Sequence, residues 1–439
     1  MSLAATLIAR HFSVLREELL VSGIAIAEIV AQHGTPLFVY DRAIMTTALA
    51  QLRAALPPSF SVSYSVKANP RHAILEYFLA QGCGLEIASV GEYYRARKAG
   101  CPPERIIFAG PGKTEAELTV VLAQGIGEIH VESLREIERV STICRHLGKR
   151  GRVAIRVNPT AEVQGGAMRM GGKPAPFGVD EEILDDIVDH VRGDTHLDLC
   201  GVHLFTGTQI LDANVLLAQY RKGVMIAKRV AQRCERPLRT VDFGGGLGIP
   251  YFANEQPLNL ASLQVGLAQV MADIDDDPFF AGTRFMLEPG RYLVGEAGLY
   301  VARIIDIKVS RGKKFLILDG GMNHHLAASG NLGQVIKRNF PLAILNRLHS
   351  GSTETVDVVG PLCTPLDTLA RDIILPVAEV GDLVGILQSG AYALTASPQE
   401  FLSHASPAEV WVAHGRVETI RPRGKHNEEE EWGREERQW

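Results

Sequence analysis

The sequence lacks paired cysteines, a long apolar run and an excess of one charge. Its six cysteines show no CxxC spacing, which argues against a zinc site and against a disulfide framework: Cys83, Cys101, Cys144, Cys200, Cys234 and Cys363. No stretch approaches the ~20 apolar residues that a membrane-spanning helix needs. The opening MSLAATLIARHF reaches Arg10 too soon for a signal peptide. These absences predict a protein of the reducing cytoplasm, with no metal site and no membrane partner.

Charge and composition narrow the class further. The 45 Lys and Arg residues are balanced by 50 Asp and Glu residues, so the basic excess of a nucleic-acid-binding protein is missing. An apolar content of 46% and a charged content of 22% exclude disorder of the whole chain. A length of 439 residues suffices for two or three domains with a substantial core.

Short apolar, β-branched runs recur through the first two thirds of the chain, and helical patterns such as 71–81 and 89–99 separate them. Strands that alternate with helices are typical of a parallel sheet covered on both faces. The eight runs match the requirement of a closed (β/α)8 barrel of the TIM type, and an open, doubly wound α/β sheet is the alternative. The runs begin at Ser61, Gly84, Arg105, Glu128, Arg152, Leu199, Thr240 and Arg284.

The pattern changes after about residue 296. Strand-like segments separated by Gly, Pro and Asp turns follow with little helix between them, which predicts a second, mostly antiparallel β-domain. The segment HGTPLFVYD, from His33, precedes the regular spacing and is expected to join that domain. We therefore predict a barrel over 41–295, a β-domain from 1–40 and 296–425, and an acidic, disordered tail over 426–439.

Lys67, in YSVKANP, is predicted to lie at the end of the first barrel strand, on the side where barrel proteins carry their catalytic groups. A charged amine is costly at the end of an apolar strand, because desolvation lowers its pKa. A neutral amine can form a Schiff base with an aldehyde. The structural alternative is a surface lysine whose charged end reaches solvent.

A glycine cluster follows the seventh predicted strand, in VDFGGGLGIPY. Gly244, Gly245 and Gly246 would expose backbone N–H groups and allow close approach to a phosphate. The spacing matches neither GxGxxG nor the GK[ST] of a P-loop, so ATP is disfavoured. Loops after the late strands of a barrel often hold phosphate, and a simple turn is the alternative.

Polar side chains also follow two other predicted barrel strands. Glu288, in LEPGRYLV, must be hydrogen-bonded or paired to stay charged. Against a pyridine nitrogen it would keep that nitrogen protonated, and the alternative is an ion pair with Arg291. His203 and Thr208, in GVHLFTGTQ, supply a hydroxyl and an imidazole, which either stacks on a cofactor or is an ordinary core histidine.

The predicted β-domain contributes two weaker candidates. Cys363, in VVGPLCTPLD, follows a Gly-Pro turn, although most free cysteines are simply small buried apolar residues. Asp367 lies four residues further on, and an aspartate there is more often a turn or cap residue than part of a site.

These motifs, in this order, resemble the fold type III pyridoxal-phosphate decarboxylases, a family that includes diaminopimelate, ornithine and arginine decarboxylases. The resemblance runs from about residue 33 to residue 412, and YSVKAN with GGGxG and EPGR is its most specific combination. It implies a barrel with a β-domain, pyridoxal 5'-phosphate (PLP) as the cofactor, and a homodimer with shared active sites.

The resemblance also implies roles around the cofactor ring. Lys67 would be the Schiff-base lysine, and Glu86 would be the acidic residue beside it. His203 would stack on the ring, and Glu288 would pair with the pyridinium nitrogen. Such a ring spreads the negative charge left on the α-carbon when carbon dioxide departs.

Further residues would hold the phosphate and the substrate. The phosphate would be bound by Gly244, Gly245, Gly246, Thr208 and Tyr392. Arg291 would lie near the phosphate or the substrate carboxylate. Cys363 of the other subunit would donate a proton to the decarboxylated carbon, with Asp367 beside the substrate amine.

The chain departs from diaminopimelate decarboxylases at places that bear on the substrate. Thr364 stands where they usually have a glutamate, and Phe205 replaces the second histidine of their His-x-His strand. Their Arg-Pro-x-Leu-Tyr run is replaced by GGMNHHLAASGN, which has no arginine to grip a distal carboxylate. This segment and SPQEFLSHASPAEVWV resemble a subgroup that decarboxylates a glutamyl or related residue on an acyl-carrier protein, some of whose members are associated with exosortase gene clusters.

We therefore expect a PLP-dependent decarboxylase acting on an amino-acid moiety, with a carrier-bound substrate as the sharpest version. A decarboxylase of free diaminopimelate, ornithine or lysine is the first alternative. A racemase is the second, but Cys363 argues against it because a racemase would use a catalytic tyrosine. A non-catalytic relative is the third, and the presence of both Lys67 and Cys363 disfavours it.

Overall fold

The computed structural model describes residues 2–160, 168–169, 174–205, 207–334, 336–349 and 351–425. Contacts divide the chain into two compact units. The barrel unit comprises Leu49–Ile249 and Gln256–Tyr292, and the β-unit comprises the chain up to Ala48, Pro250–Glu255 and the part after Tyr292. The predicted acidic tail, 426–439, lies outside the described residues.

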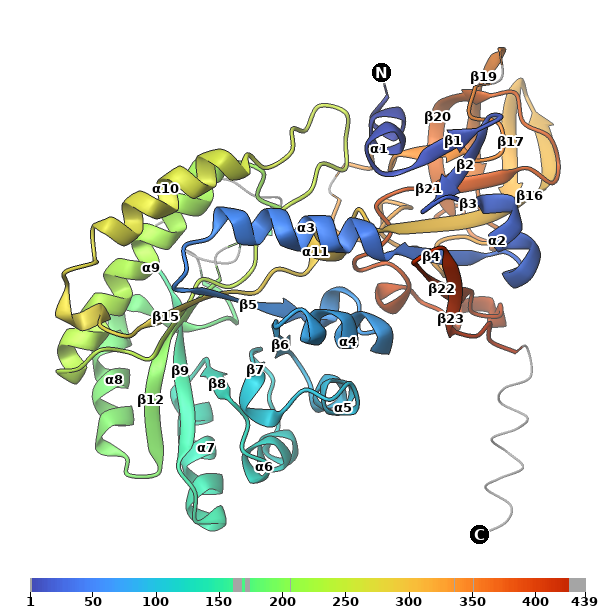
Figure 1. Cartoon of the computed structure of the whole chain (residues 1–439). Coiled ribbons are helices and arrows are strands. Elements are labelled where there is room, and N and C mark those ends of the chain that lie inside the picture. Colours follow the sequence, from blue (N-terminus) through green and yellow to red (C-terminus); the bar gives the residue numbers. More distant parts are fainter. Residues whose placement is uncertain are drawn as a thin grey trace, which may run out of the picture. The chain divides into compact units, whose positions relative to one another are not determined.

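Within the described residues, eight parallel strands of the barrel unit form a closed ring, which confirms the predicted fold class and excludes the open sheet (Figure 1). Each of the eight apolar runs became a strand. Closure follows from the pairing of Ile129 with Val153 and of Leu287 with Val62. In ring order the strands are β5 (Phe60–Ser65), β6 (Gly84–Ile87), β7 (Ile106–Phe108), β8 (Glu128–Val131), β9 (Gly151–Asn158), β12 (Leu197–Leu204), β14 (Thr240–Asp242) and β15 (Arg284–Leu287).

Helices alternate with the barrel strands along the chain and lie outside the ring (Figure 1). The two patterns predicted over 71–81 and 89–99 are helices one residue shorter at each end, because Arg71 and Ser89 are the capping residues. The Ser89 hydroxyl accepts a hydrogen bond from the backbone of Glu92, which satisfies a free N–H of the first turn. The helices are α3 (Arg42–Ala55), α4 (His72–Ala80), α5 (Val90–Lys98), α6 (Glu115–Ala123), α7 (Leu134–Leu147), α8 (Leu184–Gly193), α9 (Ala213–Cys234) and α10 (Leu260–Ala272).

The C-terminal ends of the parallel strands meet at one rim of the barrel, so residues far apart in the sequence are neighbours there. A short 3-10 turn over Val66–Ala68 follows β5 and carries Lys67. Gly290, just after β15, packs on this turn, where an added Cβ would lie 2.8 Å from the Ala68 Cβ. The ends of the first and last barrel strands are therefore held together closely.

As predicted, the β-unit contains a mostly antiparallel sheet. Its strand order is β20-β19-β17-β16-β4-β22-β23. The predicted early segment is β4 (Leu37–Asp41), which pairs antiparallel with β16 and parallel with β22. The other strands of the sheet are β16 (Gly298–Ser310), β17 (Lys313–Leu318), β18 (Leu342–Ile344), β19 (Thr353–Val359), β20 (Thr368–Pro376), β21 (Leu383–Ile386), β22 (Ala408–Ala413) and β23 (Arg416–Arg421).

The beginning of the chain covers one side of this sheet. Leu7, Ile26 and Ile29 pack in one apolar cluster with Val39 and Val301. The elements involved are α1 (Leu3–His11), β1 (Ser13–Leu15), β2 (Glu18–Val21), β3 (Ile24–Ala25) and α2 (Ile26–His33). Burial of this apolar cluster stabilises the β-unit.

No helix in the described part of the chain is both long enough and apolar enough to cross a bilayer.

Candidate active site

Lys67 and Glu86 form an ion pair at the ends of β5 and β6. The Lys67 Nζ lies 2.9 and 3.0 Å from the two carboxylate oxygens of Glu86. The Glu86 side chain is fully buried, whereas 45% of the Lys67 side chain is exposed. The Ser65 hydroxyl also donates to Glu86, so the carboxylate has one fixed orientation. Lys67 is thus an accessible amine whose position is set by a buried carboxylate.

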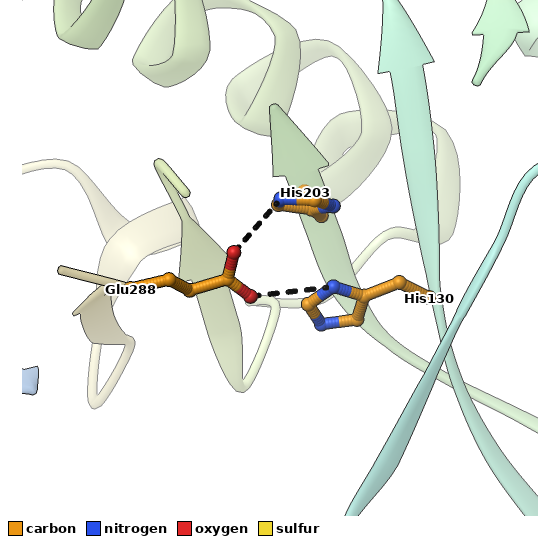
Figure 2. A group of neighbouring side chains, drawn as sticks. All are labelled: His130, His203 and Glu288. Carbon is orange, nitrogen blue, oxygen red and sulfur yellow. Dashed lines mark ion pairs between the residues drawn. The ribbon is translucent and has the colours of Figure 1, made fainter. Parts of the chain in front are cut away.

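His203 and Glu288 meet at the ends of β12 and β15. The Glu288 carboxylate points one oxygen toward each of two imidazoles, those of His203 and His130 (Figure 2). The nitrogen–oxygen distances are 3.6 Å to His203 and 3.9 Å to His130. Burial, followed by the neighbouring His130 and Arg156, keeps the pKa of His203 well below its usual value, so the ring is neutral.

These three residues have ligand types that a divalent metal ion also uses. Their candidate ligand atoms all lie within 4.8 Å of one another. However, both nitrogens of His203 lack a hydrogen-bond partner among the described residues. The Oε1 of Glu288 also lacks one there. Buried polar atoms without partners indicate that a further group completes this site, and the expected absence of metal stays a prediction.

Below this pair lies a buried cluster of acidic residues that the sequence interpretation missed. Glu128 accepts hydrogen bonds from His130 and from the Thr240 hydroxyl, at 3.2 and 2.7 Å. The Oδ2 of Asp242, the last residue of β14, lies 4.0 Å from the same Nε2 of His130 that contacts Glu128. A signal was present in the sequence, since His130 and Asp242 are polar residues inside apolar strand runs.

The glycine cluster forms a tight loop directly above Glu288. Gly244 has φ 67°, and its N–H donates to the Asp242 carboxylate at 2.7 Å. An added Cβ would lie 2.8 Å from the Leu204 carbonyl oxygen at Gly244, and 2.6 Å from that of Glu288 at Gly245. Gly246 also has a positive φ, 97°. The backbone therefore approaches its neighbours more closely than any side chain allows.

Arg156 is a second group that the sequence interpretation missed. It is buried on β9 and pairs with Glu132 at 2.8 Å. Its guanidinium lies 5.0 Å from the Phe177 ring and 5.9 Å from the Phe205 ring. Burial raises the pKa of Glu132, but the charges of Arg156 and Lys113 outweigh burial and lower it overall. An arginine inside the apolar run RVAIRVNP was the available signal.

The remaining barrel candidates lie near these groups along the chain. Thr208 is on the two-residue strand β13 (Gly207–Thr208), and its segment is tied to the glycine loop by a hydrogen bond from the Ile210 N–H to the Gly246 carbonyl at 2.9 Å. Arg291 begins the short helix α11 (Arg291–Val294), shortly after Glu288.

Cys363 is the exposed member of the six cysteines, all of which lie within the described residues. Burial raises the pKa of Cys83, Cys101 and Cys144 to about 11. Those thiols are therefore protonated and shielded, whereas Cys363 is accessible on a loop of the β-unit.

Asp367 is held by backbone groups of the β-unit. It is buried, and its two oxygens accept hydrogen bonds from the N–H groups of Met322 and Leu362, at 2.6 and 2.9 Å. Gly321 and Gly360 leave room for it, since a Cβ at either would lie within 2.3 Å of its oxygens. In the β-unit Asp367 thus anchors the loop that carries Cys363, and its contact with a substrate amine stays a prediction.

Tyr392 lies in the β-unit with a left-handed backbone, φ 54°. A non-glycine residue in this region is uncommon and tends to occur at functional sites. Its predicted contact with phosphate would involve the other unit, so it stays a prediction.

The barrel rim therefore combines groups with complementary chemistry. It offers an accessible amine beside a carboxylate, a carboxylate beside a neutral imidazole, and a loop of closely packed backbone. These groups suit a flat ring that carries an aldehyde, a basic nitrogen and a phosphate.

Comparison with known proteins agrees with this chemistry. The family described as pyridoxal-dependent decarboxylase, pyridoxal binding domain, matches residues 42–295. The L-glutamyl-[BtrI acyl-carrier protein] decarboxylase of Niallia circulans is 37% identical over 404 residues, which cover 91% of this chain and 94% of the relative. The diaminopimelate decarboxylase of Aquifex aeolicus is 32% identical over 411 residues, which cover 93% and 94%.

Solved structures share the whole architecture. The diaminopimelate decarboxylase of Helicobacter pylori complexed with L-lysine has a TM-score of 0.83 at 29% identity, covering 94% of this chain and 100% of that chain. The M. jannaschii diaminopimelate decarboxylase in complex with L-lysine has a TM-score of 0.88 at 26% identity, covering 95% and 96%. From its motifs, its barrel and these matches, the chain belongs to the family of pyridoxal-dependent decarboxylases.

Proposed function

We propose that this PLP-dependent enzyme removes the α-carboxylate of an amino-acid moiety that is attached to an acyl-carrier protein. The observation that carries the reaction is the position of two pairs, Lys67 with Glu86 and His203 with Glu288, at the ends of barrel strands. The carrier-bound substrate is supported by the 37% identity with a relative named for such a substrate.

The residues present fit PLP. The two buried nitrogens of His203 have no hydrogen-bond partner in the described part of the chain, and a cofactor ring would cover them. Gly244, Gly245 and Gly246 leave space where any side chain would collide with the backbone. This loop would hold the phosphate, with Thr208 and Tyr392 as further donors, and residues 41–295 would form the cofactor-binding domain.

Each residue then has one task. When bound, PLP accepts the electron pair that the departing carboxylate leaves on the α-carbon. Lys67 holds the aldehyde end, and Glu86 fixes the Lys67 amine. Glu288 keeps the pyridine nitrogen protonated, and the neutral His203 supports the face of the ring. The Cys363 Sγ gives a proton to the α-carbon, a role that depends first on position.

The segment 320–331 favours a substrate without a free distal amino-acid end. It contains two histidines and no arginine. Burial is the largest cause that lowers the pKa of His324 to about 4 and of His325 to about 3, so both are neutral near pH 7. Neither side chain provides the positive charge that a distal carboxylate would need. An amino-acid residue joined to a carrier protein at that end has no free distal carboxylate and therefore needs no such positive charge.

The proposal includes a cytoplasmic homodimer in which Cys363 serves the partner's barrel. Free cysteines, five of them buried, suit a reducing compartment. The accessible loop of Cys363, anchored by Asp367, is suited to reach a second subunit.

A decarboxylase of free diaminopimelate is the second candidate, because the Aquifex aeolicus relative bears that name at 32% identity. The test is carbon dioxide release from a panel of free diaminopimelate, lysine, ornithine and arginine, together with a glutamyl-carrier protein. We expect release from the carrier-bound substrate alone, no release by Lys67→Ala, and no effect of a metal chelator. Comparable release from free diaminopimelate would favour the second candidate. No release from any substrate would contradict both.

A further inference from the structure

Two buried carboxyl groups, those of Asp242 and Glu288, lie beneath the proposed cofactor ring. Asp242 ends β14, and its side chain is 0% exposed. Its Oδ1 accepts the Gly244 N–H at 2.7 Å, whereas its Oδ2 has no hydrogen-bond partner in the described part of the chain. An unsatisfied oxygen at this depth would be costly.

Glu288, which follows β15, also has a buried carboxylate oxygen, Oε1, that lacks a hydrogen-bond donor among the described residues. Both carboxyl groups approach one imidazole, because the Asp242 Oδ2 lies 4.0 Å from the Nε2 of His130 and the Glu288 Oε1 lies 3.9 Å from its Nδ1. After burial and the charge of Glu288, a hydrogen bond with Glu288 is among the causes that raise the pKa of Asp242. Two buried carboxylates that face each other cannot both be ionised at modest cost. One proton shared between them satisfies both oxygens.

The surroundings of Asp242 favour its carboxyl group, and not that of Glu288, as the one that carries the shared proton. Burial raises the pKa of Asp242 well above its usual value, and the negative charge of Glu288 adds to this effect. The other groups that face it are His130, 4.0 Å away, and the carboxylate of Glu128, which adds a further small increase. Glu288 instead points its Oε2 toward His203 and is free to act as the acceptor.

We propose that Asp242 is a positioning residue that carries a proton and donates it in a hydrogen bond to Glu288, so that Glu288 keeps one orientation toward the cofactor nitrogen. This inference rests on the proposed function, since the role of Glu288 belongs to that proposal. The other oxygen of Asp242 holds Gly244, and the Gly244 carbonyl accepts the Glu288 N–H at 2.7 Å. Asp242 therefore links the carboxylate under the ring with the loop proposed to hold the phosphate.

The test compares three variants of the full chain. Asp242→Asn keeps the acceptor for the Gly244 N–H and offers an N–H donor to Glu288, so it imitates the protonated acid. Asp242→Ala removes both bonds. Glu132→Gln is the control, because it also changes a buried carboxylate of the barrel, but one that pairs with Arg156 at 2.8 Å.

The first measurement is the infrared difference spectrum of the cofactor-free protein at neutral pH, in the carbonyl region of protonated carboxylic acids. We expect wild type minus Asp242→Asn to show such a band, and wild type minus Glu132→Gln to show none. Absence of the Asp242 band in a folded Asn variant would overturn the inference. This readout does not require PLP to bind, so it remains decisive if the proposed function fails.

The second measurement is the dissociation constant for PLP, with the absorbance maximum of the bound form. Asp242→Asn should bind within about threefold of wild type with the same maximum, and Asp242→Ala at least about tenfold more weakly, because only the alanine loses both bonds. An Asn variant as weak as the Ala variant would contradict a donor at this position. If Asp242→Ala does not fold, the Asn variant and the infrared band still decide.

Discussion

Lys67 and Glu86 form an ion pair in which one partner is accessible and the other is completely enclosed. The amine lies 2.9 and 3.0 Å from the two oxygens of a carboxylate that has no exposed surface. Because the Glu86 carboxylate is buried and cannot turn toward solvent, it holds the Lys67 amine in one position. The first prediction follows from this relationship.

Lys67→Ala should abolish the visible absorbance near ~420 nm that an imine between PLP and a lysine gives, because it removes the amine that lies beside Glu86. Glu86→Gln should keep the band but weaken PLP binding by about tenfold, since the fixed charge beside the amine is lost. The measurement is an absorbance titration with PLP. Lys98→Ala, at an exposed position of α5, is the control and should match wild type.

Gly245→Ala should weaken PLP binding, because the new Cβ would lie 2.6 Å from the Glu288 carbonyl oxygen. This close contact would displace either the end of β15 or the glycine loop. Overpacking of this kind costs roughly 1–3 kcal/mol, or about 5- to 150-fold in affinity if the loop alone yields. Gly193→Ala is a matched control, since nothing lies within 4 Å of its added Cβ. Equal affinities for the two variants would show that the loop does not bind the cofactor.

His325 should make the protein less stable in acid. Its Nε2 lies 2.9 Å from the Ser389 hydroxyl, which itself donates to the Ile386 carbonyl, and its Nδ1 accepts the Ala328 N–H at 3.3 Å. Only a neutral ring protonated on Nε2 satisfies this arrangement. Burial correspondingly lowers its pKa from 6.5 to about 3.

The unfolded chain therefore binds this proton more readily than the folded chain. The stabilisation is complete above pH 6.5 and decreases as the pH falls toward 3. Between pH 7.5 and 5 the loss from His325 should be about 2 kcal/mol, measured by urea unfolding of the cofactor-free protein. His325→Gln should flatten this dependence, and His146→Gln, at an exposed position on α7, should leave it unchanged.

Cys363→Ala should retain PLP and its absorbance but lose clean formation of the amine product, because the proton donor to the α-carbon is missing. Product analysis by mass spectrometry separates this outcome from a simple loss of binding. Cys234→Ala, which changes a buried cysteine of α9, is the control. Unchanged product from Cys363→Ala would remove this residue from the reaction.

A mixture of Lys67→Ala and Cys363→Ala subunits should recover part of the activity that each variant lacks. In a dimer with shared sites, half of the sites in each mixed pair would be intact. Activity should therefore approach one quarter of wild type for randomly mixed dimers, counted as about half the dimers having one good site. Proven mixed dimers without activity would show that each site is built from one subunit.

The barrel was predictable because its strands are buried on both faces and so appear as continuous apolar runs. All eight runs, from Ser61 to Arg284, form strands of the ring. The helices after the first two strands were also recognisable, since their apolar residues recur three and four positions apart. The short elements before β4 were not predicted, because their strands span only two to four residues.

The polar groups inside the barrel were harder to predict than its strands. Lys67, Glu288 and the glycines stand at strand ends, where position alone suggests function. His130, Arg156 and Asp242 lie within strands or at their last residue, and their neighbours come from strands distant in sequence. Only closure of the ring brings those partners together.

The buried Asp367 fixes the backbone of the loop that carries Cys363. The carboxylate holds the N–H groups of Met322 and Leu362, and within the loop the Thr364 hydroxyl accepts the Leu366 N–H at 3.3 Å. The apolar side chains of Pro365 and Leu366 have no group that could form a hydrogen bond in this loop. Pro365 and Leu366 are exposed, and Thr364 is partly so. If Cys363 acts as proposed, a library randomised at Pro365 and Leu366 would vary the surface beside the thiol while the Asp367 anchor and Thr364 keep the loop in place.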